Sequence, residues 1–313
     1  MKEGSNLRFS VIIPTCHRND LLAKCLDCLA PGQQLGGVCV EDGGQRSGGG
    51  SQNSEVSGQS SVVSRQCPMF TYEVIVTDDG SKSTAREMVE KNFPWARWIE
   101  GPRRGPAANR NNGAKHAQGK WLVFTDDDCL PDAGFLAGYS QAARDNNAPV
   151  LEGKTSPVGI RTRVDMECPA NETGGYLWSC NLAIRKDLFF ELDGFDTNFS
   201  GAAMEDVDFR TRLLKAGKAI KFVPTALVLH PWRLKKGFSF LKLYGKSRRY
   251  FIAKHPETAN SISLLSLGLN LARLLIRQLP PVALDCRCRG LGRELLLAFY
   301  TTYVLIAYTR RSN

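Results

Sequence analysis

Two acidic clusters directly follow short apolar segments of the chain. Tyr72–Thr77 runs into Asp78–Ser81 (DDGS), and Trp121–Thr125 runs into Asp126–Asp128 (DDD). Adjacent carboxylates repel one another, and three at the end of a buried strand are costly unless a cation compensates their charge. Mg²⁺ and Mn²⁺ prefer carboxylate oxygens and leave positions open for substrate phosphates. The clusters therefore indicate a divalent-metal site, against the simpler alternatives of a helix cap at the first and a solvated turn at the second.

A third acidic cluster begins a predicted helix. Glu205, Asp206 and Asp208 lie in its first turn, Lys215 lies in its last turn, and Gly217 follows. Acids near the N-terminus of a helix and bases near its C-terminus stabilise it through the helix dipole, so a structural role accounts for much of this pattern. A carboxylate at a helix N-terminus also stays ionised at neutral pH, as a general base must. The spacing alone leaves both interpretations open.

Strands and helices alternate around these clusters. The predicted strands are Phe9–Ile13, Tyr72–Thr77, Arg97–Glu100 and Trp121–Thr125, and the predicted helices begin at Asn19 or Asp20, at Ser81 and at Pro106. This alternation is typical of a parallel sheet with helices on its faces. Ligands of such sheets bind beyond the carboxyl ends of the strands, where the acidic clusters lie. The chain contains neither a P-loop nor a GxGxxG motif, which argues against a Walker ATPase and a Rossmann dehydrogenase.

The composition is that of an ordinary globular chain. Of the 313 residues, 42% are hydrophobic and 23% are charged, which suits one large domain with an appendage. Residues 36–66 are dominated by Gly, Ser and Gln and predict a flexible surface insertion. The ten cysteines form no secreted disulfide pattern, and residues 1–7 lack the apolar core of a signal peptide, so we expect a reducing, cytoplasmic setting. Cys25 and Cys28 lack the second pair that a zinc site with CxxC spacing needs.

Five motifs, in order, make the chain resemble the family 2 glycosyltransferases of the GT-A fold. They are SVIIPTCHR (10–18), YEVIVTDDGS (72–81), GPAANRNNGAKHAQGKWLVFTDDDC (105–129), SCNLAIRKDLFFELDGFD (179–196) and MEDVDFRTRLLKAG (204–217). The resemblance implies an α/β GT-A domain over residues 7–233. This domain would have a mostly parallel central sheet flanked by helices, with a Rossmann-like nucleotide-binding half and an acceptor half. Residues 234–313 would form a C-terminal helical tail.

The resemblance also implies a donor site and a metal site. The residues that would bind the nucleotide sugar are Pro14, Thr15, Arg18, Asp78, Asp79, Arg110, Asp126 and Asp127. Asp128 would bind Mn²⁺ or Mg²⁺ directly, together with Asp126 and with His230 from the segment LVLHPWR. It is equally consistent with the sequence that His230 is a surface histidine after a strand and binds no metal.

The implied reaction moves a sugar from a UDP-, GDP- or dTDP-sugar to a hydroxyl acceptor, with inversion at the anomeric carbon. Asp206 would be the catalytic base, with Glu205 as an acceptor contact or substitute base. Trp178 and Asn181 would border the acceptor, although an aromatic residue at such a position is more often simply packed. Two other classes stay open: a nucleotidyltransferase of similar fold, and a non-catalytic protein that binds nucleotide sugars or serves as a membrane scaffold.

The basic charge of the chain is concentrated in its tail. Residues 231–313 contain 15 Lys and Arg against 3 Asp and Glu, a net charge of +12, whereas the whole chain carries +10. The polar residues of the first apolar tail segment form one narrow stripe: Ser263, Ser266, Asn270, Arg273 and Arg277. The second segment, Leu295–Tyr308, is shorter than the about twenty residues that span a bilayer.

Two interpretations of the tail compete. Its helices either pack on the catalytic domain or bind the cytoplasmic face of a membrane as a peripheral anchor. We favour the anchor, which would suit a lipid-linked or envelope-polysaccharide acceptor. The long leucine-rich faces argue against nucleic acid as the partner.

Overall fold

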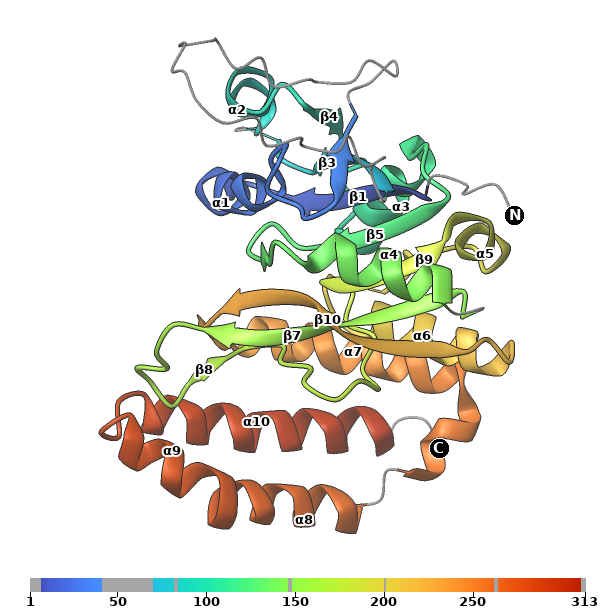
Figure 1. The fold of residues 1–313 in the computed structure, drawn as a ribbon. Coiled ribbons are helices and arrows are strands. Elements are labelled where there is room, and N and C mark those ends of the chain that lie inside the picture. The colour runs from blue at the N-terminus through green and yellow to red at the C-terminus, as the bar shows by residue number, and fades with distance from the viewer. Residues whose placement is uncertain are drawn as a thin grey trace, which may run out of the picture.

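The computed structural model describes residues 7–40, 70–81, 84–145, 148–199, 201–261 and 264–310. A central sheet with helices packed against it forms the upper part of the molecule in Figure 1, and helices from the C-terminal end of the chain lie below it. Residues 1–6, which carry most of the segment used to judge a signal peptide, lie outside the described ranges.

The main sheet is mostly parallel, as predicted. Its strands are β1 (Leu7–Thr15), β2 (Gly37–Cys39), β3 (Phe70–Asp78), β4 (Ala96–Glu100), β5 (Trp121–Thr125), β6 (Leu130–Pro131), β7 (Val150–Val158), β9 (Asn181–Arg185) and β10 (Ile220–Pro231). Their order is β2-β3-β1-β5-β9-β7-β10-β6, and β4 pairs with β3. β9 runs antiparallel to both of its neighbours, β5 and β7, and separates two parallel parts of the sheet. A small second sheet pairs β8 (Met166–Glu167) with β11 (Arg233–Leu234).

The helices cover this sheet and continue into the tail. They are α1 (Asn19–Leu29), α2 (Arg86–Asn92), α3 (Pro106–His116), α4 (Phe135–Asp145), α5 (Lys186–Glu191), α6 (Glu205–Lys215), α7 (Phe238–Lys254), α8 (Leu264–Arg273), α9 (Leu279–Asp285) and α10 (Leu291–Arg310). α3 approaches β1 closely at Gly113, which has no side chain. A Cβ atom at this position would lie only 2.4 Å from the Ile12 side chain. Nearer the start of α3, Asn109 Nδ2 donates to the Thr15 carbonyl at 3.4 Å, so the first turn of α3 lies at the carboxyl end of β1.

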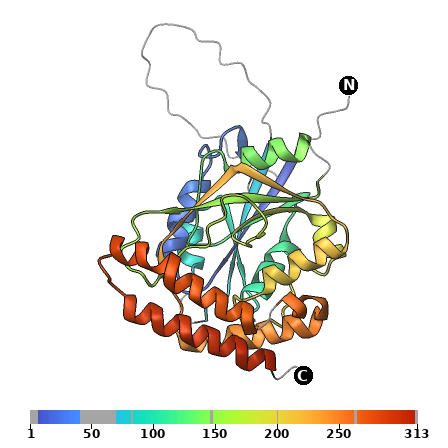
Figure 2. The same cartoon turned by 90° about the horizontal axis from the view of Figure 1, so that it is seen from below.

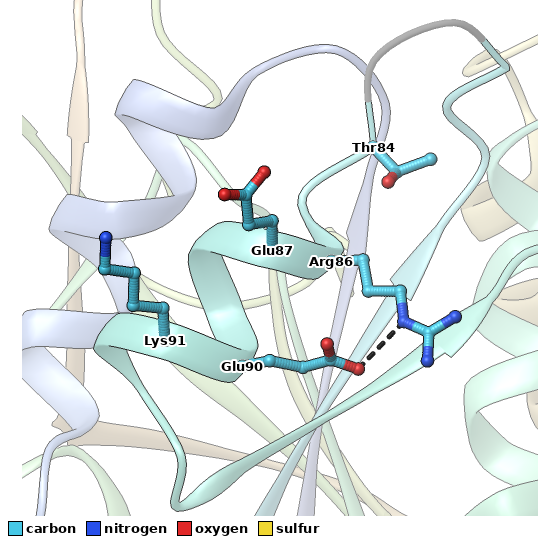
Figure 3. Close-up of a pocket in the computed structure, with 5 residues that line it drawn as sticks. All are labelled: Thr84, Arg86, Glu87, Glu90 and Lys91. Atoms are coloured by element: carbon cyan, nitrogen blue, oxygen red, sulfur yellow. Dashed lines mark hydrogen bonds and ion pairs between the residues drawn. The ribbon is translucent and has the colours of Figure 1, made fainter.

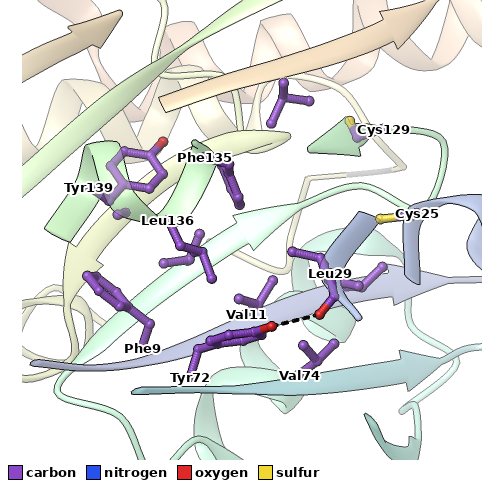
Figure 4. Close-up of a cluster of buried hydrophobic side chains, with 14 of the residues drawn as sticks. Phe9, Val11, Cys25, Leu29, Tyr72, Val74, Cys129, Phe135, Leu136 and Tyr139 are labelled. Carbon is purple, nitrogen blue, oxygen red and sulfur yellow. Dashed lines mark hydrogen bonds between the residues drawn. The ribbon is translucent and has the colours of Figure 1, made fainter. Parts of the chain in front are cut away.

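Alternation along β1 divides the core between the two faces of the sheet. Phe9, Val11 and Ile13 are buried on one face with α1 and α4, whereas Ile12 is buried on the other face with α3. The hydroxyl of Tyr72 donates a hydrogen bond of 3.0 Å to the Leu29 carbonyl within the first cluster (Figure 4). Each buried side chain of this size stabilises the fold by about 1.5–3 kcal/mol. The strands that end in acidic residues are therefore fixed on both sides.

Two local predictions were wrong. Gly37–Cys39 belongs to the range 36–66 predicted as an insertion, but it forms β2 and pairs in parallel with β3. Cys39 is buried there, so the edge of β3 ordered this stretch in spite of its composition. Residues 41–66 lie outside the described ranges. Ser81 does not begin the next helix: α2 begins at Arg86, after the Asp78 carboxylate accepts hydrogen bonds from the Gly80 and Ala85 amides at 2.8 and 2.6 Å.

The tail helices pack on one another and on the rest of the chain. α10 runs beside α7, and α8 lies along α10 in both views (Figures 1 and 2). Val164, from the loop before β8, is buried against Leu279, Ala283 and Cys286 of α9 and its C-terminal end. The predicted boundary at 233/234 falls inside β11. None of the helices in the described ranges combines the length and the apolar character needed to cross a membrane.

Candidate active site

A cavity of about 1150 Å³ lies where β1, β3 and β5 end. Its walls come from the end of β1 and the residues after it (Pro14–Arg18), the first turns of α3 and α6, and the segment from β11 into α7. The register of the sheet pairs Thr15 with Asp78 and Ile12 with Phe124, so the ends of the three strands meet at one edge. Residues from all five sequence motifs therefore line one space.

Arg110 joins two of the acidic clusters across this cavity. Its Nη2 atom donates to Asp126 Oδ1 at 2.6 Å, and its Nη1 atom donates to Glu205 Oε1 at 3.2 Å. The Arg110 and Glu205 side chains are each only 4% exposed. Burial would lower the pKa of Arg110, but the two carboxylates outweigh it and raise the pKa. Arg110 therefore stays charged and ties the end of β5 to the start of α6.

Asp206 lies next to this pair and faces the cavity. The preceding residue, Met204, is in the left-handed region (φ 73°), where it turns the chain into α6. Asp206 Oδ1 accepts a hydrogen bond of 2.8 Å from the Val207 amide. Burial and the neighbouring Glu205 carboxylate raise the pKa of Asp206 to about 7, although Arg110 opposes the shift. A carboxylate that titrates near neutral pH is well suited to accept a proton.

Asp127 points away from the cavity. It is fully buried, its Oδ2 atom accepts a hydrogen bond of 2.7 Å from the Thr15 hydroxyl, and Arg18 Nη2 lies 2.5 Å from its Oδ1 atom. Successive residues after a strand point to different sides, so Asp126 lines the cavity and Asp127 does not. The predicted contact between Asp127 and the donor is therefore corrected: Asp127 holds the Thr15–Arg18 segment in place.

Asp128 and His230 meet behind this segment. His230 Nδ1 lies 2.8 Å from the Pro231 carbonyl and must donate to it, which turns Nε2 toward Asp128 Oδ1 at 3.4 Å. Both of these facing atoms are buried and lack a hydrogen-bond partner of good geometry. Burial alone would lower the pKa of His230, but Asp128 raises it to about 10, so the imidazole is protonated when no metal is bound.

This pair fits a divalent cation. An imidazole whose Nδ1–H is bound to a carbonyl is the usual orientation of a metal-binding histidine, and a metal ion would take the place of the proton on Nε2. The ligand atoms of Asp128, His230 and Cys129 lie within 4.8 Å of one another. Cys129 was not predicted for this site. Asp126 was predicted as a ligand, but in this structure it pairs with Arg110 instead.

The first acidic cluster also divides into an inner and an outer residue. Asp78 is 1% exposed, and its oxygens bind amides of the turn before α2 together with Trp98 Nε1 at 3.3 Å. Asp79 lines the cavity and accepts hydrogen bonds from the amides of Arg103 and Gly105 at 2.8 and 3.2 Å. Of the two residues predicted to contact the nucleotide, the structure presents Asp79 and uses Asp78 to shape the turn.

The two predicted acceptor residues differ in the same way. Trp178 lines the cavity, stacks on Tyr176 with ring centres 5.3 Å apart, and has a buried Nε1–H without a partner. Asn181 is 1% exposed and is used entirely inside the sheet, where it binds the Tyr139 hydroxyl and the carbonyls of Lys154 and Ala226. The predicted role of Asn181 as an acceptor contact is therefore corrected to a structural one.

Sequence reasoning missed two groups of residues. Glu152 is 2% exposed and accepts hydrogen bonds from the amides of Gly175, Tyr176 and Leu177, so it shapes the loop that presents Trp178. Phe240 and Tyr244 of α7 line the cavity, although the segment was predicted as tail. The acidic residue Glu152 within an apolar strand, followed by Gly153, could have indicated the first group. The second group, Phe240 and Tyr244, depends on the packing of α7 against the cavity, which is not a local property of the sequence.

A smaller hollow of about 450 Å³ lies on the surface of α2 (Figure 3). Its lining residues are Thr84, Arg86, Glu87, Glu90 and Lys91. Arg86 and Glu90 form an exposed i,i+4 ion pair at 2.8 Å, an interaction worth only about 0.3–0.5 kcal/mol. The hollow lies on one short exposed helix, and we assign no function to it.

The fold is that of the GT-A class of glycosyltransferases, with acidic clusters at the strand ends and a histidine beside one of them. The chain belongs to family 2 of the glycosyltransferases. The family described as "Glycosyl transferase family 2" matches residues 60–168, and "Glycosyltransferase like family 2" matches residues 177–255. The family predicted from the five motifs is therefore confirmed.

Relatives of known name are similar over the same region. A pre-mycofactocin glycosyltransferase of Mycobacterium tuberculosis is 30% identical over 236 residues, which cover 64% of this chain and 49% of that protein. The glycosyltransferase AglE of Haloferax volcanii is 26% identical over 198 residues, 56% of this chain and 64% of that one. The chain thus spans about half the length of the first of these relatives and about two thirds of the second.

Two solved structures share the fold. The mannosyltransferase PcManGT from Pyrobaculum calidifontis, in complex with GDP-Man and Mn²⁺, superposes with a TM-score of 0.54 and 17% identity, over 98% of this chain and 86% of that one. GalNAc-T7 with UDP, GalNAc and Mn²⁺ gives a TM-score of 0.51 and 14% identity, over 91% of this chain and 55% of that one. At these identities the likeness establishes the GT-A fold.

Proposed function

We propose that this protein transfers a sugar from a nucleotide-diphosphate donor to a hydroxyl acceptor, with inversion at the anomeric carbon and with Mn²⁺ or Mg²⁺ bound at the site. The observation that carries the proposal is the convergence of Asp79, Asp126, Glu205 and Asp206 on one cavity, with the Asp128–His230 pair beside it. The solved structures of similar fold hold nucleotides or nucleotide sugars with Mn²⁺, which supports the same kind of donor here.

The residues take distinct parts in this reaction. Asp206 accepts the proton of the acceptor hydroxyl, and the hydroxyl oxygen then attacks the anomeric carbon on the face opposite the leaving group. Asp128 and His230 would hold the cation, which offsets the charge that develops on the leaving nucleoside diphosphate. Arg110 pairs with Asp126 and Glu205 and so fixes the position of both carboxylates beside Asp206. Trp178 offers a ring and an unpaired N–H to the acceptor.

We further propose that the catalytic unit, 7–233, works together with α7, and that the remaining tail is a peripheral membrane contact on the cytoplasmic face. Phe240 and Tyr244 place α7 at the cavity. The outer surface of the tail exposes Leu269, Ile276 and Leu284, together with basic residues of its net charge of +12. This combination suits an anionic lipid surface and an acceptor of the cell envelope.

Release of nucleoside diphosphate tests the proposed reaction. The purified chain is incubated with a panel of UDP-, GDP- and dTDP-sugars and candidate hydroxyl acceptors, with Mn²⁺, with Mg²⁺ and with chelator. We expect metal-dependent release that Asp206→Asn abolishes while nucleotide binding persists. Asp27→Asn, the same change at an exposed position of α1, serves as the control. A parallel incubation with nucleoside triphosphates and sugar 1-phosphates tests the other enzyme class, because a nucleotidyltransferase would release pyrophosphate from that mixture. Nucleotide binding without any release, and unchanged in Asp206→Asn, would identify a binding protein.

A further inference from the structure

The cavity has two chemically different sides. The side at the strand ends carries the acids and arginines described above, whereas the segment from β11 into α7 contributes Leu234, Phe240 and Tyr244. At about 1150 Å³ the cavity exceeds the roughly 300–1000 Å³ typical of a pocket for one small ligand. A nucleotide sugar bound among the acids and arginines therefore leaves the α7 side for a second molecule.

One cation on the α7 side has no acidic partner. The arginines that line the cavity each pair with a carboxylate: Arg18 with Asp127, Arg103 with Glu100, Arg110 with Asp126, and Arg233 with Asp128. Lys236 also lines the cavity, yet no carboxylate oxygen of the described residues lies within 4.0 Å of its Nζ atom. Nζ lies instead 4.2 Å from the centre of the Phe240 ring. Lys236 is an exposed residue, and partial desolvation together with the nearby Arg233 lowers its pKa, although Glu167 and Glu205 oppose the shift; a bound anion would stabilise its charged form.

The backbone around Lys236 is held from three directions. The Lys235 amide donates to the Asp165 carbonyl at 2.9 Å, and Lys235 Nζ lies 2.5 Å from Glu294 Oε1. Arg293 Nη2 donates to the Lys235 carbonyl at 2.5 Å. These contacts fix the backbone at Lys235 and therefore the point from which the Lys236 side chain enters the cavity.

A strip of apolar side chains leads from this cation to the outside of the tail. Leu234, which lines the cavity, is 53% exposed, and Phe238, four residues further along the chain, is 46% exposed. Phe238 packs edge-on against Tyr300 of α10, with ring centres 4.9 Å apart, and Tyr300 lies beside Tyr303. The exposed residues of α10 continue the strip as Leu296, Phe299 and Tyr303, at spacings of three and four residues. Figures 1 and 2 both show α7 and α10 side by side, as this path requires.

We propose that the α7 side of the cavity binds an anionic lipid that carries the acceptor hydroxyl, with its phosphate group at Lys236 and its hydrocarbon chain along Leu234, Phe238 and α10. The inference rests on the proposed glycosyl transfer and names the class of acceptor for it. An unpaired cation selects the anionic head group, and the exposed strip selects the chain. The net charge of +12 on residues 231–313 draws such a lipid to this side of the molecule.

Calorimetric titration with three probes tests the site: monomeric dodecyl phosphate, dodecyl glucoside and inorganic phosphate. We expect dodecyl phosphate to bind about tenfold or more tightly than either of the others, because only it uses both the cation and the strip. Lys236→Gln should weaken its binding about tenfold and Lys236→Arg should preserve it. Phe238→Ser should weaken dodecyl phosphate binding but leave inorganic phosphate unchanged. Lys242→Gln removes the same charge from an exposed position of α7 outside the cavity and should have no effect.

Two results would overturn the proposal. The first is that dodecyl phosphate binds the Lys236→Gln variant as tightly as it binds the unaltered protein. Thermal unfolding curves verify that both proteins are folded. The second is displacement of dodecyl phosphate by UDP or GDP with Mn²⁺, which would place its phosphate in the donor site. Binding of UDP and GDP is measured in parallel. Its absence, with dodecyl phosphate still bound at Lys236, would count against the proposed transfer and leave the lipid site standing.

Discussion

At the scale of single residues, proton affinity in this site follows from burial and from the order of neighbouring charges. Glu205 and Asp206 are adjacent carboxylates beside one arginine, and Arg110 contacts Glu205 directly. Burial raises the pKa of both acids, and the charge of Glu205 adds to the shift of Asp206. The arginine therefore keeps its direct partner ionised more readily than it does Asp206. That arrangement leaves Asp206 as the group that exchanges a proton near neutral pH.

The rate of transfer should therefore rise with pH. If Asp206 is the base, it acts only when ionised, and its raised pKa of about 7 means that protonation removes activity below that pH. Glu205→Gln removes the like charge next to Asp206 and should move the rising limb to lower pH. The measurement is kcat/KM for nucleoside-diphosphate release between about pH 5.5 and 9. A profile that is flat across neutrality would show that another group takes the proton.

The metal site gives a second prediction at this scale. His230→Ala removes one of the two buried atoms that face each other without a hydrogen bond, so Mn²⁺-dependent binding of UDP or GDP should weaken by at least about tenfold. Binding measured with chelator should change little, because the substitution leaves the Thr15–Arg18 segment and Asp79 in place. His116→Ala, at an exposed position of α3, is the control. Equal Mn²⁺ dependence in both variants would place the cation elsewhere.

At the scale of elements, α6 is held against α7 by a buried carboxylate. Asp208 is fully buried and lies 2.8 Å from Arg212, 2.9 Å from Lys254 and 2.8 Å from His255. Lys254 also pairs with Asp196 at 2.6 Å. These contacts place the N-terminal turn of α6, and with it Asp206, relative to the α7 wall of the cavity. The tail helix α7 is thus a structural part of the site.

Asp208→Asn should lower the free energy of unfolding far more than an equivalent substitution at an exposed position does. It leaves three cationic or imidazole groups around a neutral amide, and we expect a loss of about 2–4 kcal/mol in the free energy of unfolding. Asp187→Asn breaks the exposed ion pair with Arg185 and should cost less than about 1 kcal/mol. Urea titration measures both. Similar losses in the two variants would mean that the contacts of Asp208 do not secure α6.

At the scale of the whole molecule, charge and exposed apolar surface both gather at one end. Among the residues from Leu234 to Tyr303 whose side chains the structure describes, eight large apolar ones are about half exposed or more. They are Leu234, Phe238, Leu269, Ile276, Leu284, Leu296, Phe299 and Tyr303. The exposed stripe of the first tail segment contains Asn270, Arg273 and Arg277 as predicted, but Leu269 and Ile276 share that surface. The side chains of Ser263 and Ser266 lie outside the described part of the chain. The outer face is therefore mixed, as in helices that lie at a lipid–water interface.

This distribution predicts selective binding to anionic vesicles. The protein should sediment with phosphatidylglycerol vesicles but not with phosphatidylcholine vesicles, and salt should weaken the binding, since each basic residue near the surface contributes about 1 kcal/mol. Replacing Leu296, Phe299 and Tyr303 together with Ser should reduce sedimentation, whereas Leu35→Ser, at an exposed position far from the tail in sequence, should not. Binding that ignores lipid charge would refute the proposed orientation.

The sequence by itself determined the elements and the family. Strand and helix periods are local properties, so the ends of β3 and β5 and the start of α6 could be predicted, and with them the acids that follow. The order of the five motifs along the chain identified the family, because five motifs together are far more specific than any single one. Edge pairing is not local. For that reason β2 was hidden inside a Gly- and Ser-rich stretch, where β3 supplied the hydrogen bonds that composition could not predict.

Only the tertiary structure decided which of neighbouring polar residues face the cavity. Asp79 and Asp126 point into it. Asp78 instead accepts hydrogen bonds from backbone amides, and Asp127 pairs with Arg18. Asn181 makes its hydrogen bonds inside the sheet. These outcomes depend on which groups distant segments bring into hydrogen-bond range, over separations of more than 100 residues for Thr15 with Asp127 and for Asp128 with His230. The return of α7 to the cavity has the same origin: the buried charge of Asp208 is compensated by Arg212 of its own helix and by Lys254 and His255 at the far end of α7.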